Sequence, residues 1–68
     1  MTNKYSGNIL IRLEAVRART GLGRSTLYKM ISTGDFPAQI KITEKAVAWA
    51  SDEVDQWITK KITDRVTH

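Results

Sequence analysis

The chain has 68 residues, a formal net charge of +4 at pH 7, no cysteine and a single histidine, His68. This length predicts one small domain, which buries only about 60% of the surface of its unfolded chain. Without cysteine the chain forms no disulfide and no thiolate metal site, and one histidine cannot build a metal or catalytic cluster. No apolar run approaches the ~20 residues of a membrane span, and no signal-peptide core is present. We therefore expect a cytoplasmic protein that has no membrane contact.

Positive charge is concentrated in the first half of the chain. Residues 1–34 carry six lysines or arginines and one glutamate, whereas residues 35–68 carry five basic and six acidic residues. Basic side chains gain affinity for nucleic acids because they displace counterions from phosphates. The first half is therefore predicted to face a polyanion such as double-stranded DNA. A slightly basic, solvated surface explains the charge alone equally well.

The chain begins with a mostly polar stretch, residues 1–8, in which Tyr5 is the only aromatic residue, and a flexible arm is predicted there. A single domain is expected over residues 9–65. The alternation of side-chain character over residues 9–12, with Ile9 and Ile11 on one face, predicts a short extended segment. Residues 13–20 contain good helix formers and predict a helix of about two turns. Gly21 is placed as the glycine that follows this helix with positive φ.

A second helix is predicted over residues 24–33, directly after a tight turn that ends at Gly23. Leu27 and Ile31 are one turn apart and predict a buried face, while the polar residues spread over the other side. Gly34 is a second helix-ending glycine, and Pro37 blocks continuation. Two short helices joined by a tight turn indicate a helix-turn-helix, with residues 24–33 as the recognition helix.

A β-hairpin is predicted over residues 39–49, where the period of the apolar residues changes to two. Ile40, Ile42, Val47 and Trp49 are expected to form one apolar face that packs on the helices. The extended segment near residue 10 is available as a third strand. Helix, turn, helix and hairpin together predict a mostly α fold with a small β-hairpin wing: a winged helix-turn-helix of three helices and a two- or three-stranded antiparallel sheet.

A third helix is predicted over residues 52–65, with Ser51 as its N-cap. Asp52, Glu53 and Asp55 fill its first turn, where carboxylates complement the helix dipole. The same cluster is conceivable as a metal or acid-base site, but no base, nucleophile or phosphate cradle accompanies it. We therefore expect no enzymatic activity, no metal, no cofactor and no small-molecule ligand. Trp49 and Trp57 fall on apolar faces and are interpreted as core residues rather than stacking platforms for single strands.

The candidate DNA contacts lie on the recognition helix, at the turn and at the hairpin tip. A major groove admits one α-helix, whose N-terminal residues reach base edges, and an arginine fork matches guanine O6 and N7. The predicted contacts on the helix are Arg24, Ser25, Thr26, Tyr28 and Lys29. The predicted flanking contacts are Arg19 near the turn, and Lys41, Thr43 and Lys45 on the wing. Alternatively, Tyr28 packs at the helix edge, and the wing lysines serve only to protect a strand edge.

Nearly the whole chain resembles a known family. The spacing of Thr20-Gly21-Leu22, Arg24-Ser25-Thr26, Tyr28, Phe36-Pro37 and Trp49 is similar to that of the AlpA-like prophage regulators, which belong to the MerR-like and excisionase-like winged-helix group. The resemblance implies a DNA-binding regulator of a prophage or other integrated element. Gly23 departs from the family's usual serine, and Thr43-Glu44-Lys45 departs from its Gly- or Arg-rich wing tip.

Our main hypothesis is a sequence-specific transcriptional regulator that binds double-stranded DNA. Two alternatives share much of the sequence evidence: an excisionase that bends DNA, and a protein-interaction module that binds an integrase or repressor. One such domain contacts few base pairs, so further copies on DNA, or a recombinase or polymerase partner, are expected.

Overall fold

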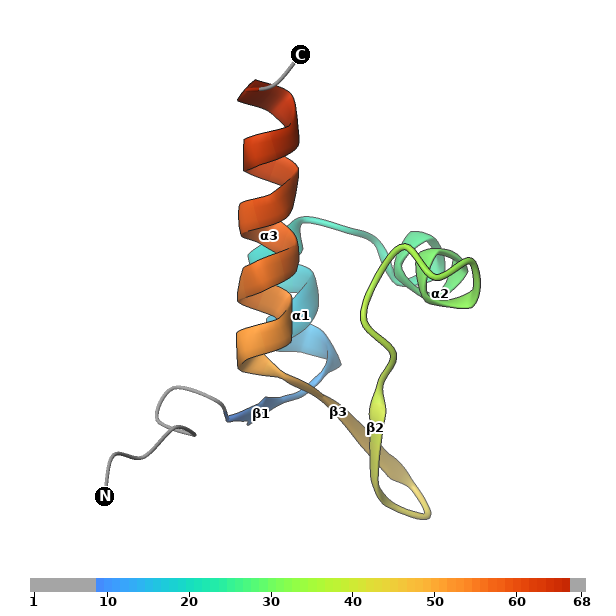
Figure 1. Ribbon diagram of the computed structural model, residues 1–68. Helices are drawn as coiled ribbons and strands as arrows, with labels where there is room; N and C mark the ends of the chain where they lie inside the picture. Colours follow the sequence, from blue (N-terminus) through green and yellow to red (C-terminus); the bar gives the residue numbers. More distant parts are fainter. Residues whose placement is uncertain (1–8, 67–68) are drawn as a thin grey trace, which may run out of the picture.

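The computed structural model describes residues 9–66 and contains three helices and a three-stranded antiparallel sheet (Figure 1). The helices are α1 (Leu13–Thr20), α2 (Arg24–Ser32) and α3 (Ser51–Val66), and the strands are β1 (Leu10–Ile11), β2 (Ile40–Thr43) and β3 (Ala46–Ala50). These bounds differ from the predicted helix and hairpin ranges by one residue at most. The predicted fold class is confirmed, whereas the predicted arm, residues 1–8, lies outside the described residues.

The turn between α1 and α2 is built by Gly21, which follows α1 with a φ of 76°. Its amide donates a hydrogen bond to the Arg17 carbonyl at 2.8 Å, and this closes the helix end. The Thr20 hydroxyl accepts a hydrogen bond from the Leu22 amide at 3.2 Å. A left-handed backbone is nearly free of strain only for glycine, so the prediction for Gly21 is confirmed.

The end of α2 is closed by two nested hydrogen bonds. The Asp35 amide donates to the Met30 carbonyl at 2.7 Å, and the Gly34 amide donates to the Ile31 carbonyl at 3.1 Å. Gly34 has a φ of 84°, as this type of helix end requires. The chain then leaves α2 through Phe36 and Pro37 toward β2.

The hydrophobic core lies where α1, α2, α3 and the sheet meet. Its buried members are Val16, Leu27, Phe36, Trp49 and Val54. The interpretation of Trp49 as a core residue is confirmed, since its side chain is fully buried. Its indole Nε1 donates to the Pro37 carbonyl at 3.1 Å. In Figure 1 the last turns of α3 extend beyond the other elements, and Ile62 in this part of the helix is 51% exposed.

The sheet has the order β1-β3-β2, with both pairs antiparallel. Its register differs from the predicted apolar face. Ile40 pairs with Ala48, and Lys41 pairs with Val47. Directly paired residues share one face of a sheet, so Ile40 lies opposite to the face of Val47 and Trp49. Ile40 and Ile42 are 39% and 45% exposed, and the prediction that they pack on the helices was wrong.

The hairpin turn explains this register. Only Glu44 and Lys45 separate the strands, and no residue other than glycine has a positive φ in the described part of the chain. The primed turns that suit two-residue hairpins need positive φ, so this turn is of another type. The Thr43 hydroxyl accepts a hydrogen bond from the Lys45 amide at 3.2 Å. The register shifts between Lys41 and Thr43, which lets the strands pair despite the unsuited turn.

Within residues 9–66, no helix combines the length and apolar character that a membrane span requires.

Candidate nucleic-acid interface

The predicted recognition helix, α2, gathers four of the predicted contact residues on its solvent-facing side. Arg24, Ser25, Thr26 and Lys29 are all exposed, whereas Leu27 on the opposite side is fully buried. Three of the four exposed residues lie in the first turn of the helix. An arginine, two hydroxyl groups and a lysine form a surface that donates many hydrogen bonds and carries no carboxylate.

Tyr28 connects this surface to the core. It is half-buried, and its ring centroid lies 6.2 Å from that of Trp49. The Arg24 guanidinium carbon lies 5.8 Å from the centroid of the Tyr28 ring. A cation above an aromatic face is attracted by about 0.5–1 kcal/mol at an exposed site. Tyr28 therefore packs at the helix edge and also supports Arg24.

The N-terminus of α2 carries no side-chain cap. Gly23 is the N-cap residue, with no side-chain hydrogen bond, and the first turn contains no acidic residue. The first amides of a helix have no partner within the helix and carry a partial positive charge. This end of α2 is therefore electropositive from its backbone as well as from Arg24.

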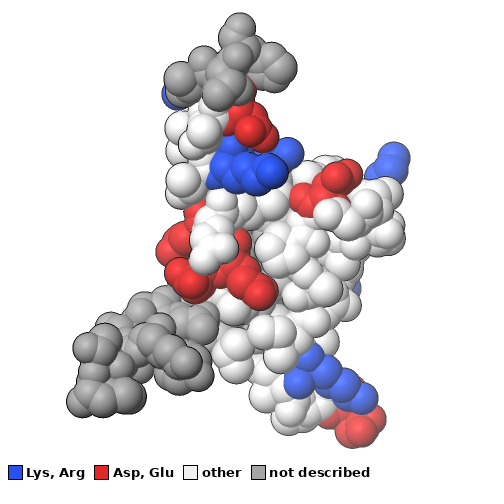
Figure 2. All heavy atoms as spheres, in the orientation of Figure 1, with Lys and Arg blue, Asp and Glu red and all other residues white. Residues whose placement is uncertain are grey.

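The wing lies on the same side of the molecule as α2, with α3 on the other side (Figure 1). Lys41, Thr43 and Lys45 are exposed on the hairpin. The Lys41 ammonium lies 3.6 Å from a Glu44 carboxylate oxygen, so part of the positive charge of the wing is neutralised. Figure 2 shows basic and acidic atoms side by side at this tip.

Arg19 is not brought together with the α2 residues. Its guanidinium forms an ion pair with the Asp55 carboxylate and donates to the Ser51 hydroxyl at 3.0 Å. Both partners are in the first turns of α3. Ser51, the predicted N-cap, is the first residue of α3 and accepts this hydrogen bond. Arg19 thus links α1 to α3.

Arg17 lies beside a hollow of about 370 Å³ at the turn, which Gly21, Leu22 and Gly23 also line. Its guanidinium is 3.6 Å from the Glu14 carboxylate, while its Nε is buried without a hydrogen-bond partner. This arginine is close to the α2 N-terminus, whereas the flanking contact predicted from the sequence near the turn was Arg19.

The N-terminal part of α3 is acidic. Asp52 and Glu53 are exposed in its first turn, and Figure 2 shows acidic atoms gathered at this end of the helix and basic atoms further along it. The Asp52 carboxylate accepts a hydrogen bond from the side-chain Nε2 of Gln56 at 3.1 Å. A polyanion is therefore repelled from the start of α3, whereas the first turn of α2 attracts it.

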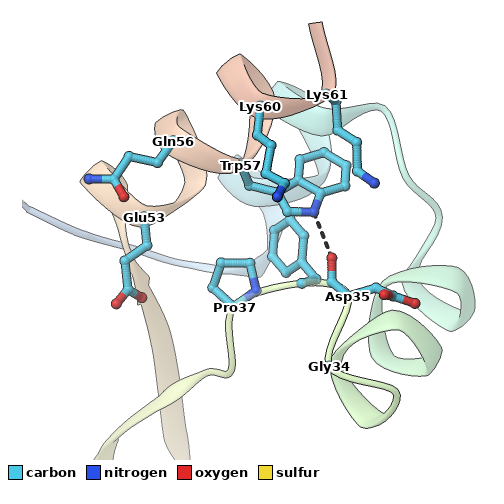
Figure 3. Close-up of a pocket in the computed structure, with 9 residues that line it drawn as sticks. Gly34, Asp35, Pro37, Glu53, Gln56, Trp57, Lys60 and Lys61 are labelled. Atoms are coloured by element: carbon cyan, nitrogen blue, oxygen red, sulfur yellow. Dashed lines mark hydrogen bonds between the residues drawn. The ribbon is translucent and has the colours of Figure 1, made fainter. Parts of the chain in front are cut away.

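The sequence did not identify a groove beside Trp57. Trp57 was interpreted as a core residue, yet it is only half-buried and lines a groove together with Lys60 and Lys61 (Figure 3). The spacing of the two lysines, three and four residues after a tryptophan on one helix, was the available signal, since such residues are neighbours on the helix surface.

A helix-turn-helix whose second helix presents a basic face, with a hairpin wing on the same side, defines a winged helix-turn-helix protein. The chain belongs to the family described as prophage CP4-57 regulatory protein (AlpA), whose sequence profile matches residues 9–62. The resemblance drawn from the sequence motifs is thereby confirmed.

Two relatives show the range of similarity. The chain is 40% identical over 55 residues to the uncharacterized protein ORF88 of Enterobacteria phage P4, a match that covers 81% of this chain and 62% of the relative. It is 29% identical over 65 residues to the DNA-binding transcriptional activator AlpA of Escherichia coli K12, with 87% of this chain and 93% of the relative covered. The chain thus spans somewhat less than two thirds of the phage P4 protein and nearly the full length of the E. coli one.

Proposed function

We propose that this protein is a sequence-specific DNA-binding regulator of a prophage or other integrated element, and that α2 enters the major groove. The observation that carries this proposal is the solvent-facing side of α2. It places Arg24, Ser25, Thr26 and Lys29 on one side of a short helix that is anchored from behind by Leu27. The E. coli relative, named as a DNA-binding transcriptional activator, supports the same function.

Each residue of this surface has a distinct role in the proposal. Arg24, held over Tyr28, reads guanine O6 and N7 through its two-pronged guanidinium. Ser25 and Thr26 lie at the helix N-terminus and donate hydroxyl hydrogen bonds to bases or phosphates. Lys29, one turn further, neutralises a phosphate. The first amides of α2 bind a backbone oxygen, because an uncapped helix N-terminus attracts anions.

The wing contributes a smaller part of the affinity. Lys45 and Thr43 contact the DNA backbone beside the recognition helix, while Lys41 is partly neutralised by Glu44. Arg19, which is engaged with α3, acts through stability rather than through DNA contact. The protein acts in the cytoplasm of a bacterial cell, where its target is the bacterial nucleoid.

Several copies bind together on one operator in this proposal. A single domain of this size buries too little DNA for useful specificity in a genome, so adjacent copies or a partner protein supply the rest. Footprinting of an operator should show more than one protected half-site, with occupancy that rises cooperatively. One isolated half-site, bound tightly and independently, would contradict this part of the proposal.

Binding-site selection from a random duplex library tests the proposed function. The protein should enrich one sequence, and its affinity for that duplex should fall steeply with salt as counterions are released. A reporter gene behind the selected site should change its expression. If no duplex binds even at low salt, the proposal is wrong. If the DNA is strongly bent and transcription does not respond, a recombination function replaces the regulatory one.

A further inference from the structure

A groove of about 510 Å³ runs between α3 and the loop that joins α2 to β2 (Figure 3). Asp35 and Pro37 line it from the loop, and Glu53, Trp57, Lys60 and Lys61 line it from α3. The groove adjoins the C-terminal end of α2, whereas Arg24, Ser25 and Thr26 are at the N-terminal end of that helix. The groove therefore remains accessible to a partner when the first turn of α2 is bound to DNA.

The apolar floor of this groove is held in place by two contacts. The Trp57 indole Nε1 donates to the Asp35 carbonyl at 2.7 Å. The Trp57 ring also packs edge-on against buried Phe36, with ring centroids 4.9 Å apart. A hydrogen bond and a core contact together leave one face of a large aromatic side chain fixed and partly exposed. A rigid aromatic surface costs little conformational entropy when it binds a partner.

Two lysines rise beside this floor. Figure 3 shows Lys60 and Lys61 extending from α3 toward the loop. The Lys61 ammonium lies 5.5 Å from the Trp57 ring centroid, and both lysines are exposed. Neither lysine forms an ion pair with another residue of the described chain, residues 9–66, although three other basic side chains do. Their charge is thus available to an external carboxylate.

The lining favours a protein segment over a nucleic acid. Glu53 lines the same groove, and the Asp35 side chain lies at its edge, so a nucleic-acid backbone, which is charged at every residue, would meet two carboxylates, whereas a protein segment can place its carboxylates at the lysines alone. An aromatic floor next to paired lysines matches an apolar side chain flanked by carboxylates, because the anchor is desolvated while the charges pair at the rim. Charge complementarity at such a rim sets orientation and partner choice.

We propose that this groove, defined by Pro37, Trp57, Lys60 and Lys61, docks an acidic segment of a protein partner, with an apolar residue on Trp57 and carboxylates at the lysines. The site is separate from the DNA-binding surface proposed above. A protein with both surfaces brings a second protein to the DNA that it occupies.

Titration of the full chain with a defined peptide tests the proposal by amide and indole NMR. The probe is the blocked peptide Gly-Ser-Leu-Phe-Glu-Asp, whose carboxylates lie on one side of the apolar pair, and its counterpart carries lysine at the two acidic positions. The Trp57 indole and the Lys60 and Lys61 amides should shift with the acidic peptide alone. The indole of fully buried Trp49 should not move and serves as an internal reference.

Charge reversal separates the groove from the DNA surface. The double substitution Lys60→Glu and Lys61→Glu should lower the affinity for the acidic peptide by about tenfold. The NMR spectrum of the variant without peptide should remain that of a folded protein. Lys45→Glu on the wing is the matched control, which should bind the peptide as before. The proposal is overturned if the acidic peptide leaves the Trp57 indole in place, or if both peptides bind equally. It is also overturned if a DNA duplex shifts the Lys60 and Lys61 signals, which would place these lysines in the DNA surface.

Discussion

The guanidinium of Arg19 at the end of α1 forms an ion pair with the carboxylate of Asp55 in α3. The same guanidinium donates to the Ser51 hydroxyl at 3.0 Å. The helix-turn-helix is therefore tied to the N-terminus of α3 by one arginine. The sequence predicts DNA contact for this arginine, and the ion pair and hydrogen bond give it a structural role.

Replacing Arg19 with alanine should lower the free energy of unfolding by about 1 kcal/mol, since a hydrogen bond and an ion pair are lost. The pair is 32% and 54% exposed, so solvent screens it, and a double-mutant cycle with Asp55→Ala should give a coupling of about 0.2–1 kcal/mol. Urea unfolding measures both. Arg65→Ala, a matched loss of charge on α3, should weaken duplex binding as little as Arg19→Ala. A larger loss of duplex affinity for Arg19→Ala, with unchanged stability, would return Arg19 to the DNA surface.

Gly21→Ala should destabilise the protein by about 1 kcal/mol, because a Cβ is strained at positive φ. Space does not limit the substitution, since no atom lies within 4 Å of the new Cβ position. Gly21→Asn should cost less, because asparagine tolerates the left-handed region better. Thermal unfolding of both variants tests this order. Equal midpoints for alanine and the wild-type glycine would show that the turn is not held at positive φ.

Gly23→Ser should raise the free energy of unfolding, in contrast to the substitutions at Gly21. Gly23 has a φ of −75°, and a Cβ there meets open space, so serine fits without strain. Its hydroxyl then accepts a hydrogen bond from an amide in the first turn of α2, which should add a few tenths of a kcal/mol to the free energy of unfolding. Chemical denaturation of the two proteins side by side measures the gain. A loss of stability would mean that the α2 amides are already satisfied in another way.

The contribution of the wing to DNA affinity is tested by two substitutions with opposite expected effects. In the proposed complex, Glu44→Ala removes a carboxylate that faces phosphate and frees Lys41, so duplex affinity should rise. Lys45→Ala should lower affinity on all sequences alike and reduce the salt slope by about one. Fluorescence anisotropy over a range of salt concentrations provides both numbers. If neither variant differs from the wild type, the hairpin does not touch DNA.

The sequence predicted the elements well because their signals are local. Gly21 and Gly34 end helices through their own backbone freedom, and the period of the apolar residues changes where β2 begins. The register of the hairpin was missed because it depends on which residue of β3 faces Ile40. Apolar residues that alternate along both strands are compatible with more than one register, and the turn selects the register that forms.

The site was predictable only in part, for a similar reason. Exposure of Arg24, Ser25, Thr26 and Lys29 follows from helical periodicity within α2. The ion pair that removes Arg19 from this surface joins residues 36 positions apart and depends on how α3 packs. The groove at Trp57 likewise needs the loop after α2 to approach α3, which no local pattern reveals.

The most direct test of the central claim is the affinity of Arg24→Ala for the selected duplex and for single-base variants of it, beside Arg65→Ala as a charge-matched control. Arg24→Ala should cost about 1–3 kcal/mol and abolish the preference at one base pair, while the control keeps both the affinity and the preference nearly unchanged. If Arg24→Ala and Arg65→Ala weaken binding equally on every duplex, α2 does not read the major groove through Arg24, and the proposed mode of DNA recognition is wrong.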